Sequence, residues 1–255
     1  MSTDLFTILD LPNKYSSYRL LSVTSDDLNN ASFVFHSLIQ SRLRASAPLK
    51  DIHNPLVVLI LTNQAYSHYS TVAAKSFGLN LKSHKDEGRL KCFDLLTDYE
   101  KYFEDNVFNF KLLVDEVVRF IVDNIVSQTD LTPCVMFDDL STFLALGVSV
   151  ADLHKFTLVL RSLSYSKQFC LIIQSTYEED SEDDELRHMV TLLSARSDIW
   201  LHLEKLKTGY SQQIDGTLTI RNIKKLNGDS VNRKFHYKTF DRNTKLYHPG
   251  AITTL

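Results

Sequence analysis

Glycine and cysteine are both scarce in this sequence of 255 residues, and each shortage excludes a class of site. None of the seven glycines is followed by lysine, so the chain contains no Gly-x-x-x-x-Gly-Lys-Ser/Thr loop to wrap the phosphates of a nucleotide. The three cysteines, Cys92, Cys134 and Cys170, are too widely spaced for a Cys-x-x-Cys metal or redox pair. We interpret them as small core residues of a protein from a reducing compartment.

Long apolar runs and catalytic motifs are also missing. No 18 consecutive residues are apolar, and the start MSTDLFTILDLPNKYSS lacks the basic and then apolar order of a secretory signal. We therefore expect no membrane span and a location in the cytosol or the nucleus. The nine histidines form no His-Glu-x-x-His pair, and no Gly-x-Ser-x-Gly occurs. We expect no catalytic residue, no metal site and no cofactor.

Short apolar runs alternate with segments of helical period, which is typical of an α/β fold. The chain is 44% hydrophobic with a net charge of −3, enough for one sizeable core, and we expect a single domain over residues 1–255. The pattern predicts strands over 18–24, 55–62, 89–96, 133–137, 168–176 and 198–206, and helices over 31–45, 69–78, 107–128, 150–164 and 185–195. Because the run PLVVLILT is apolar throughout, we expect a largely parallel sheet that is buried on both faces.

From Thr208 onward, the sequence has the pattern of hairpins. Asp215-Gly216 and Asn227-Gly228 are dipeptides that favour tight turns, and the segment RKFHYKTF alternates. The predicted fold is a twisted, largely parallel sheet flanked by helices, with an antiparallel extension at its C-terminal end.

The stretch CVMFDDLSTFLALG raises the question of whether the chain is an ATPase. Asp138 and Asp139 follow a buried strand, where nucleotide-hydrolysing domains hold magnesium, so they are a Walker B-like remnant. The loop after the first strand, TSDDLNNAS, has no glycine or lysine and places Asp26 and Asp27 where a triphosphate needs positive charge. We call it a degenerate phosphate loop. Capping of the next helix explains Asp138 and Asp139 better than metal binding does.

Two further features are candidate interaction sites. Tyr66, His68 and Tyr69 lie in the loop NQAYSHYS at the expected carboxyl edge of the sheet, as a candidate subunit interface or, equally, as packing over a helix start. The run EEDSEDDE, Glu178 to Glu185, has seven carboxylates in eight positions. We interpret this run as a flexible loop with a docking role.

Positive charge gathers near the C-terminal end, where residues 204–245 carry ten basic and four acidic side chains. The cations that flank the Asn227-Gly228 turn are candidate RNA-binding residues: Arg221, Lys224, Lys225, Arg233 and Lys234. The sequence places Phe235, His236 and Tyr237 beside them, available to stack on unpaired bases. The alternative is that these cations only balance the acidic remainder of the chain or a neighbouring subunit.

Two long blocks, Gln64–Leu81 and Val135–Phe156, resemble the sixth subunit of the Elongator complex. The acidic run and the segment Leu203–Ile220 also resemble the C-terminal half of that family, and the likeness covers most of the chain.

The resemblance implies a RecA-like fold without phosphate-binding motifs. It implies a place in a heterohexameric ring with the fourth and fifth Elongator subunits, associated with the remaining subunits. That ring is an accessory part of the machine that modifies the wobble uridine of tRNA, so this chain would be a noncatalytic assembly and tRNA-binding subunit. Two other hypotheses stay open: an ATPase with an unusual or intersubunit nucleotide site, and a freestanding scaffold unrelated to tRNA.

Overall fold

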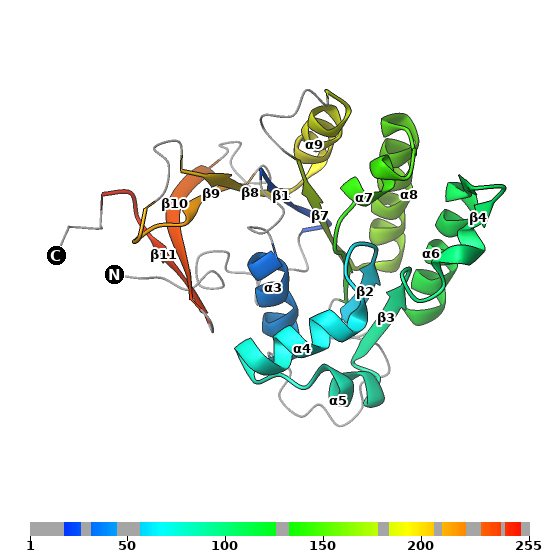
Figure 1. Cartoon of the computed structure of the whole chain (residues 1–255), viewed down its shortest axis with the longest axis horizontal. Coiled ribbons are helices and arrows are strands. Elements are labelled where there is room, and N and C mark those ends of the chain that lie inside the picture. Colours follow the sequence, from blue (N-terminus) through cyan, green and yellow to red (C-terminus); the bar gives the residue numbers. More distant parts are fainter. Residues whose placement is uncertain are drawn as a thin grey trace.

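The fold is built on one large mixed sheet, seen in a computed structural model that describes residues 18–26, 32–44, 57–125, 133–177, 184–206, 211–222, 231–240 and 243–250. Within these residues the strand order is β11-β10-β9-β8-β1-β7-β6-β2-β3 (Figure 1). Six strands are parallel: β1 (Leu20–Ser25), β2 (Val57–Leu61), β3 (Leu90–Asp94), β6 (Cys134–Phe137), β7 (Cys170–Thr176) and β8 (Ile199–Lys205). Three antiparallel strands extend the sheet beyond β8: β9 (Gly216–Asn222), β10 (Val231–Phe240) and β11 (Asn243–Tyr247). The predicted fold class is confirmed.

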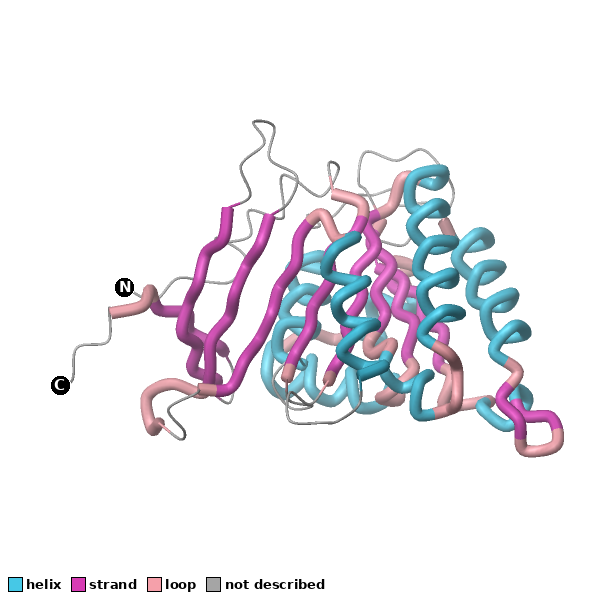
Figure 2. Tube along the Cα trace, turned by 90° about the horizontal axis from the view of Figure 1, so that it is seen from above, coloured by secondary structure: helices cyan, strands magenta, loops and turns pink. Residues whose placement is uncertain are grey.

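Helices cover both faces of the parallel strands (Figures 1 and 2). One face packs against α3 (Ser32–Arg44), α4 (Tyr66–Phe77) and α5 (Leu81–Asp86). The other packs against α6 (Phe110–Asn124), α7 (Ser141–Ala145), α8 (Val150–Lys167) and α9 (Asp184–Arg196). Side chains alternate between the two cores along each strand: Leu59 lies in the first core, and Val58 and Ile60 lie in the second. Burial on both faces explains why these strands have no polar alternation in the sequence.

The segment before α6 differs from the prediction. The expected helix from Val107 begins at Phe110, and the chain instead forms the 3₁₀ helix η2 (Tyr99–Tyr102) and a hairpin of β4 (Phe103–Glu104) and β5 (Val107–Phe108). The turn residues Asp105 and Asn106 have φ of 48° and 63°, as a type I′ hairpin turn requires. The Asn109 side chain then accepts from the Leu112 N–H at 3.0 Å and starts α6. Short-range turn and cap chemistry therefore overrides the helical period here.

The prediction that Asp215-Gly216 forms a hairpin turn is wrong. Gly216 is the first residue of β9, and a Cβ there would come within 2.5 Å of the Glu204 carbonyl oxygen and 2.6 Å of the Tyr237 hydroxyl. Glycine is required at this position by close packing rather than by a turn. The Asn227-Gly228 turn lies outside the described residues, although the antiparallel pairing of β9 with β10 is present on both sides of it.

The end of the acidic run is helical, not a loop. Residues 178–183 lie outside the described part of the chain, and the last two acids, Asp184 and Glu185, form the first turn of α9. Negative charge is favourable there, because the first turn of a helix carries unpaired N–H groups.

Candidate functional site

The carboxyl ends of the parallel strands form the edge at which an open α/β sheet holds a ligand. The polar residues at or just beyond the ends of β1, β2, β3 and β6 are Asp26, Thr62, Asp94, Asp138 and Asp139. The question at this edge is whether their oxygens face a cavity or are used by the chain itself.

The Asp138 carboxylate is surrounded by donors from the chain. The loop after β2 supplies backbone N–H groups from Thr62 at 2.7 Å, Asn63 at 3.1 Å and Gln64 at 3.0 Å. The Thr62 hydroxyl lies 2.6 Å from Oδ1, and the Tyr69 hydroxyl donates to Oδ2 over 3.4 Å. Asp138 is 1% exposed. Its oxygens tie the end of β6 to the start of the β2–α4 connection, and a metal ion would have to displace these donors.

Burial raises the pKa of Asp138, although the hydrogen bonds from residues 62–64 oppose the shift. The Thr62 hydroxyl also lies 2.6 Å from the Asp139 carbonyl oxygen, and it has only one hydrogen to donate. A proton on Asp138 Oδ1 would let Thr62 accept from Asp138 and donate to that carbonyl. The contacts of Thr62 are therefore compatible with the raised pKa.

Asp139 has the capping role expected from the sequence. Its Oδ1 accepts from the Ser141 N–H at 2.8 Å and the Ser141 hydroxyl at 2.5 Å, at the first residue of α7. Burial raises the pKa of Asp139 to about 6. Asp138 caps no helix, so the capping interpretation is wrong for the first of the two residues. Its partners lie 69 to 76 positions away, where no local pattern could reveal them.

The degenerate phosphate loop is also tied to the chain itself. The Asp26 N–H donates to the Leu203 carbonyl at 3.1 Å, and Asp26 Oδ2 accepts from the Lys205 N–H at 2.8 Å. These bonds extend the pairing of β1 with β8, and Asp26 is 6% exposed. Asp27 lies outside the described residues.

Tyr66, His68 and Tyr69 lie on the first turn of α4 rather than in a loop. Asp94, at the end of β3, accepts from the Tyr66 N–H at 2.9 Å, a capping contact that sequence reasoning missed. Tyr69 is 5% exposed and packs against Phe35, so it belongs to the core of this chain. His68 is exposed and Tyr66 is half-buried, and these two stay a predicted interface.

The predicted basic cluster is divided by the alternation of β9 and β10. Arg221 pairs with Asn232 and Lys234 with Thr219, which places both cations on one face, whereas Arg233 pairs with Ile220 and faces the other way. The prediction that Phe235 and Tyr237 are available to bases is wrong, because they are 2% and 0% exposed in the core against α3. Successive strand residues point to opposite faces, so five cations close in sequence cannot form one patch. Lys224 and Lys225 lie outside the described residues.

The face that holds Arg221 also carries a stack of planar groups that the sequence did not reveal. His202 stacks on Trp200 at 4.9 Å between ring centroids and on Tyr177 at 6.0 Å. The Arg221 guanidinium lies over the Trp200 ring, 4.6 Å from its centroid. The Thr24 hydroxyl lies 2.8 Å from both Trp200 Nε1 and His202 Nδ1. The alternation of IWLHLEK could have placed Trp200 and His202 on one face, but not the neighbours that close the stack.

Two features are missing from the described residues. No group of three or more His, Cys, Asp or Glu side chains in them is arranged to hold a metal ion. No helix among them is long and apolar enough to cross a membrane.

Comparison with known proteins agrees with this geometry. A KaiC-like protein from the hyperthermophilic archaeon Pyrococcus horikoshii superposes with a TM-score of 0.56 at 12% identity, over 90% of this chain and 89% of its own, and shows that the fold is RecA-like. Elongator complex protein 6 of Danio rerio is 28% identical over 245 residues, 89% of each chain. The human protein of the same name is 23% identical over 270 residues, 98% of each chain. The family described as Elongation complex protein 6 matches residues 3–241, and the chain therefore belongs to that family.

Proposed function

We propose that this chain is a noncatalytic subunit of the Elongator accessory ring, where it assembles with the fourth and fifth subunits. In this role it supports modification of the wobble uridine of tRNA at carbon 5, in the cytosol or the nucleus. Its contribution is structural, through assembly and through contacts with tRNA, and it uses no cofactor.

The observation that carries this proposal is the saturation of Asp138. In an ATPase of this fold the equivalent carboxylate holds magnesium beside the phosphates. Here its oxygens accept from Thr62, Asn63, Gln64 and Tyr69, and the side chain is 1% exposed. Asp26, in place of a phosphate-wrapping glycine, is bonded to the end of β8. The polar groups of the ancestral site thus serve to lock loops together.

The proposed contact with tRNA rests on the face of the antiparallel extension opposite Phe235 and Tyr237. Arg221 and Lys234 lie on this face. Lys238 of β10 and Lys245 of β11, which pair with each other, lie on it too. Lys238 is paired with Asp215 at 2.6 Å, whereas the Lys234 side chain is 56% exposed and lies 3.8 Å from Glu204. Exposed cations on a flat sheet face suit a phosphate backbone, whose attraction depends on charge rather than on sequence.

The alternative of an ATPase with an unusual or intersubunit site predicts a different binding result. We expect isothermal titration of the full chain with Mg-ATP to give no binding at concentrations up to about 1 mM, because no phosphate loop is present and Asp138 is occupied. The same titration is then made on the complex of this chain with the fourth and fifth subunits. Binding by the complex but not by the isolated chain would indicate a nucleotide site that requires the partners. A micromolar site on this chain alone would overturn the noncatalytic assignment.

A further inference from the structure

Residues 96–112, which we name the knob, concentrate apolar surface on one projecting segment. The knob contains η2, the β4–β5 hairpin and the start of α6, and it extends beyond the body of the domain (Figure 2). Nine large hydrophobic side chains of the described residues are exposed, and five of them belong to the knob: Leu96, Tyr99, Phe103, Val107 and Leu112. Val107 is 68% exposed. Single exposed apolar residues are ordinary, but a cluster of this kind marks an interaction surface.

The knob is anchored at its base. Tyr102 is 1% exposed, and its hydroxyl donates to Glu116 of α6 at 2.6 Å. The Asn109 N–H donates to the Tyr102 carbonyl at 2.7 Å, which closes the segment below the hairpin. Phe108 packs on Phe103 at 5.4 Å and on Phe143 of the core at 6.1 Å. The exposed side chains therefore stand on a fixed support, and a partner would not have to order them on binding.

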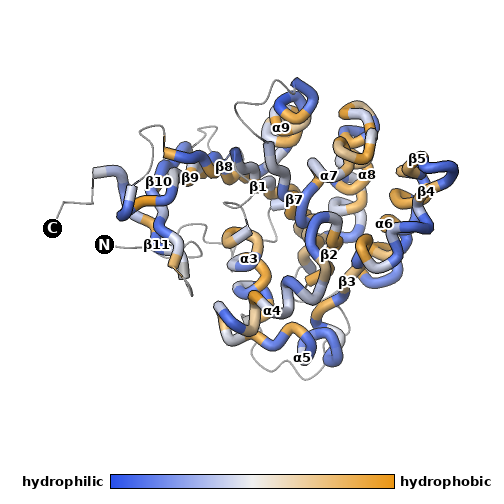
Figure 3. Tube along the Cα trace, in the orientation of Figure 1, coloured by the Kyte–Doolittle hydropathy of each residue, from blue (hydrophilic) through white to orange (hydrophobic). Residues whose placement is uncertain are grey.

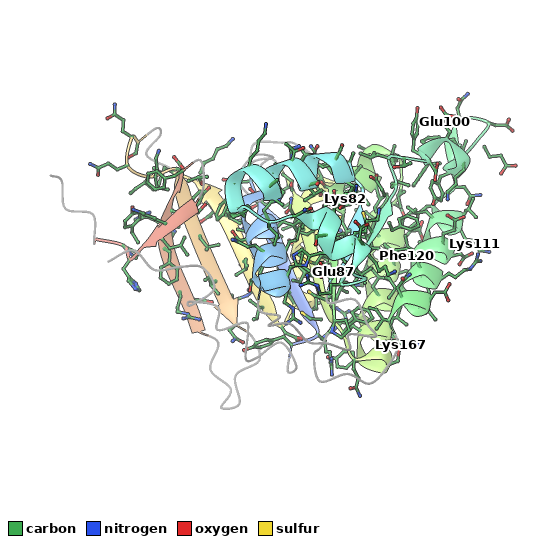
Figure 4. All side chains as sticks on the ribbon, turned by 90° about the horizontal axis from the view of Figure 1, so that it is seen from below. Lys82, Glu87, Glu100, Lys111, Phe120 and Lys167 are labelled. Carbon is green, nitrogen blue, oxygen red and sulfur yellow. The ribbon has the colours of Figure 1, made fainter. Side chains whose placement is uncertain are left out.

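Carboxylates surround this apolar cluster. Asp98, Glu100, Glu104 and Asp105 are all exposed, and Figure 4 shows Glu100 at the outer end of the knob. The Lys101 ammonium pairs with Glu116 at 2.8 Å. Lys111 is the other basic residue of the segment. Figure 3 shows hydrophobic and strongly hydrophilic residues together along this hairpin. Because the four acids repel phosphate, RNA is disfavoured as the occupant.

We propose that the knob inserts into an apolar pocket with a basic rim on a neighbouring protein subunit of the Elongator complex. Aromatic anchors surrounded by a charged rim are the usual composition of an interface centre. The rim acids would steer the knob toward lysines and arginines. Phe103 and Val107 lie on opposite faces of the hairpin, so insertion would bring them against opposite walls of the pocket. The choice of a complex subunit as partner rests on the proposed function, whereas the existence of the surface rests on the knob itself.

The test uses the full chain and the co-expressed fourth and fifth subunits, with the rest of the complex added in a second assay. A photoreactive phenylalanine analogue at position 107 should cross-link to an apolar segment of another subunit that has Lys or Arg nearby. Val107→Lys combined with Phe103→Ser should weaken association in one of the two assays by at least about tenfold, as loss of a central anchor does. Glu104→Lys should slow association and reduce its salt dependence.

Matched variants separate the knob from general surface effects. Val159→Lys on α8 and Phe240→Ser on β10 replace side chains that are 46% and 47% exposed elsewhere, and each should change association less than twofold. Unfolding temperatures of the knob variants should stay near that of the native chain. Undiminished association of the knob variants, or cross-links only to RNA or to a second copy of this chain, would overturn the knob proposal alone. Failure of the native chain to associate at all would overturn the proposed function and the named partner with it.

Discussion

The two halves of the sheet use their polar side chains in opposite ways. In the parallel half, helices cover both faces, and the acids at the carboxyl edge bond to loops of the same chain, as Asp138 does with residues 62–64. In the antiparallel half, the described helices cover the face that contains Phe235 and Tyr237. On the opposite face Lys234 is exposed, whereas Arg221 is half-buried and donates to the Ser194 carbonyl of α9 at 3.2 Å.

This difference underlies two of the proposals: a structural role for the carboxyl edge and a partner for the antiparallel face. At the edge that holds nucleotide in an ATPase, a metal ion would have to displace the donors of the buried Asp138 carboxylate, which is costly. On the antiparallel face, the Lys234 side chain is 56% exposed and lies 3.8 Å from Glu204. Solvent screens such an exposed ion pair, so a partner can still reach this charge. Three experiments test this contrast, from the largest expected effect to the smallest.

Asp138→Ala should cause the largest change, a loss of about 3 to 5 kcal/mol in the free energy of unfolding. The substitution leaves the N–H groups of residues 62–64 and the Tyr69 hydroxyl without their acceptor in a buried site. Urea denaturation gives the value, and Asp138→Asn, which keeps one acceptor oxygen, should lose less. Asp115→Ala removes an exposed acid of α6 and should change stability by less than about 0.5 kcal/mol. Equal losses in the two alanine variants would contradict the proposed lock.

Asp139 should make stability depend on pH. Its pKa is raised to about 6 in the folded chain, above the value of about 4 expected when unfolded, so the folded state binds this proton more tightly. Its contribution to stability is therefore fully present below pH 4 and is lost as pH rises to 6 and above, by about 2 to 3 kcal/mol. Asp139→Asn cannot titrate and should lack this component, while other groups titrate in both proteins. The unfolding free energy at pH 4, 5, 6 and 7 checks the difference, and parallel curves would exclude a raised pKa.

Lys234 and Arg233 provide the smallest but most direct test of the antiparallel face. They are adjacent in sequence and lie on opposite faces of β10. Lys234→Ala should weaken tRNA binding by the assembled ring and reduce the slope of log affinity against log salt by about one unit, the value of one phosphate contact. Arg233→Ala should leave both quantities nearly unchanged. The reverse result would move the RNA path to the other face of the extension.

Much of the fold and part of the site could be predicted from the sequence. Continuous apolar runs such as Val57–Leu61 predicted buried parallel strands, because strands covered on both faces need no polar positions. The absence of a glycine-lysine loop was equally plain, since a phosphate-binding backbone requires those residues in sequence order. The capping of α7 by Asp139 was also accessible, because its partner Ser141 is two residues away.

The remaining features depend on contacts between distant residues. Asp138 and Asp139 are adjacent aspartates with different roles. Asp138 binds the loop after β2 because β2 pairs with β6 in the sheet, which the local sequence does not reveal. Gly216 has a turn-like context, but packing of Tyr237 and Glu204 fixes its role. The side-chain positions of β9 and β10 separate Arg233 from Lys234, and the turn at Asp105-Asn106 keeps Val107 in solvent instead of in a helix. The sequence by itself determined the local backbone preferences and the apolar pattern. The tertiary structure decided which polar groups met a partner. The reason is that hydrogen-bond partners far apart in the chain become neighbours only when the sheet forms.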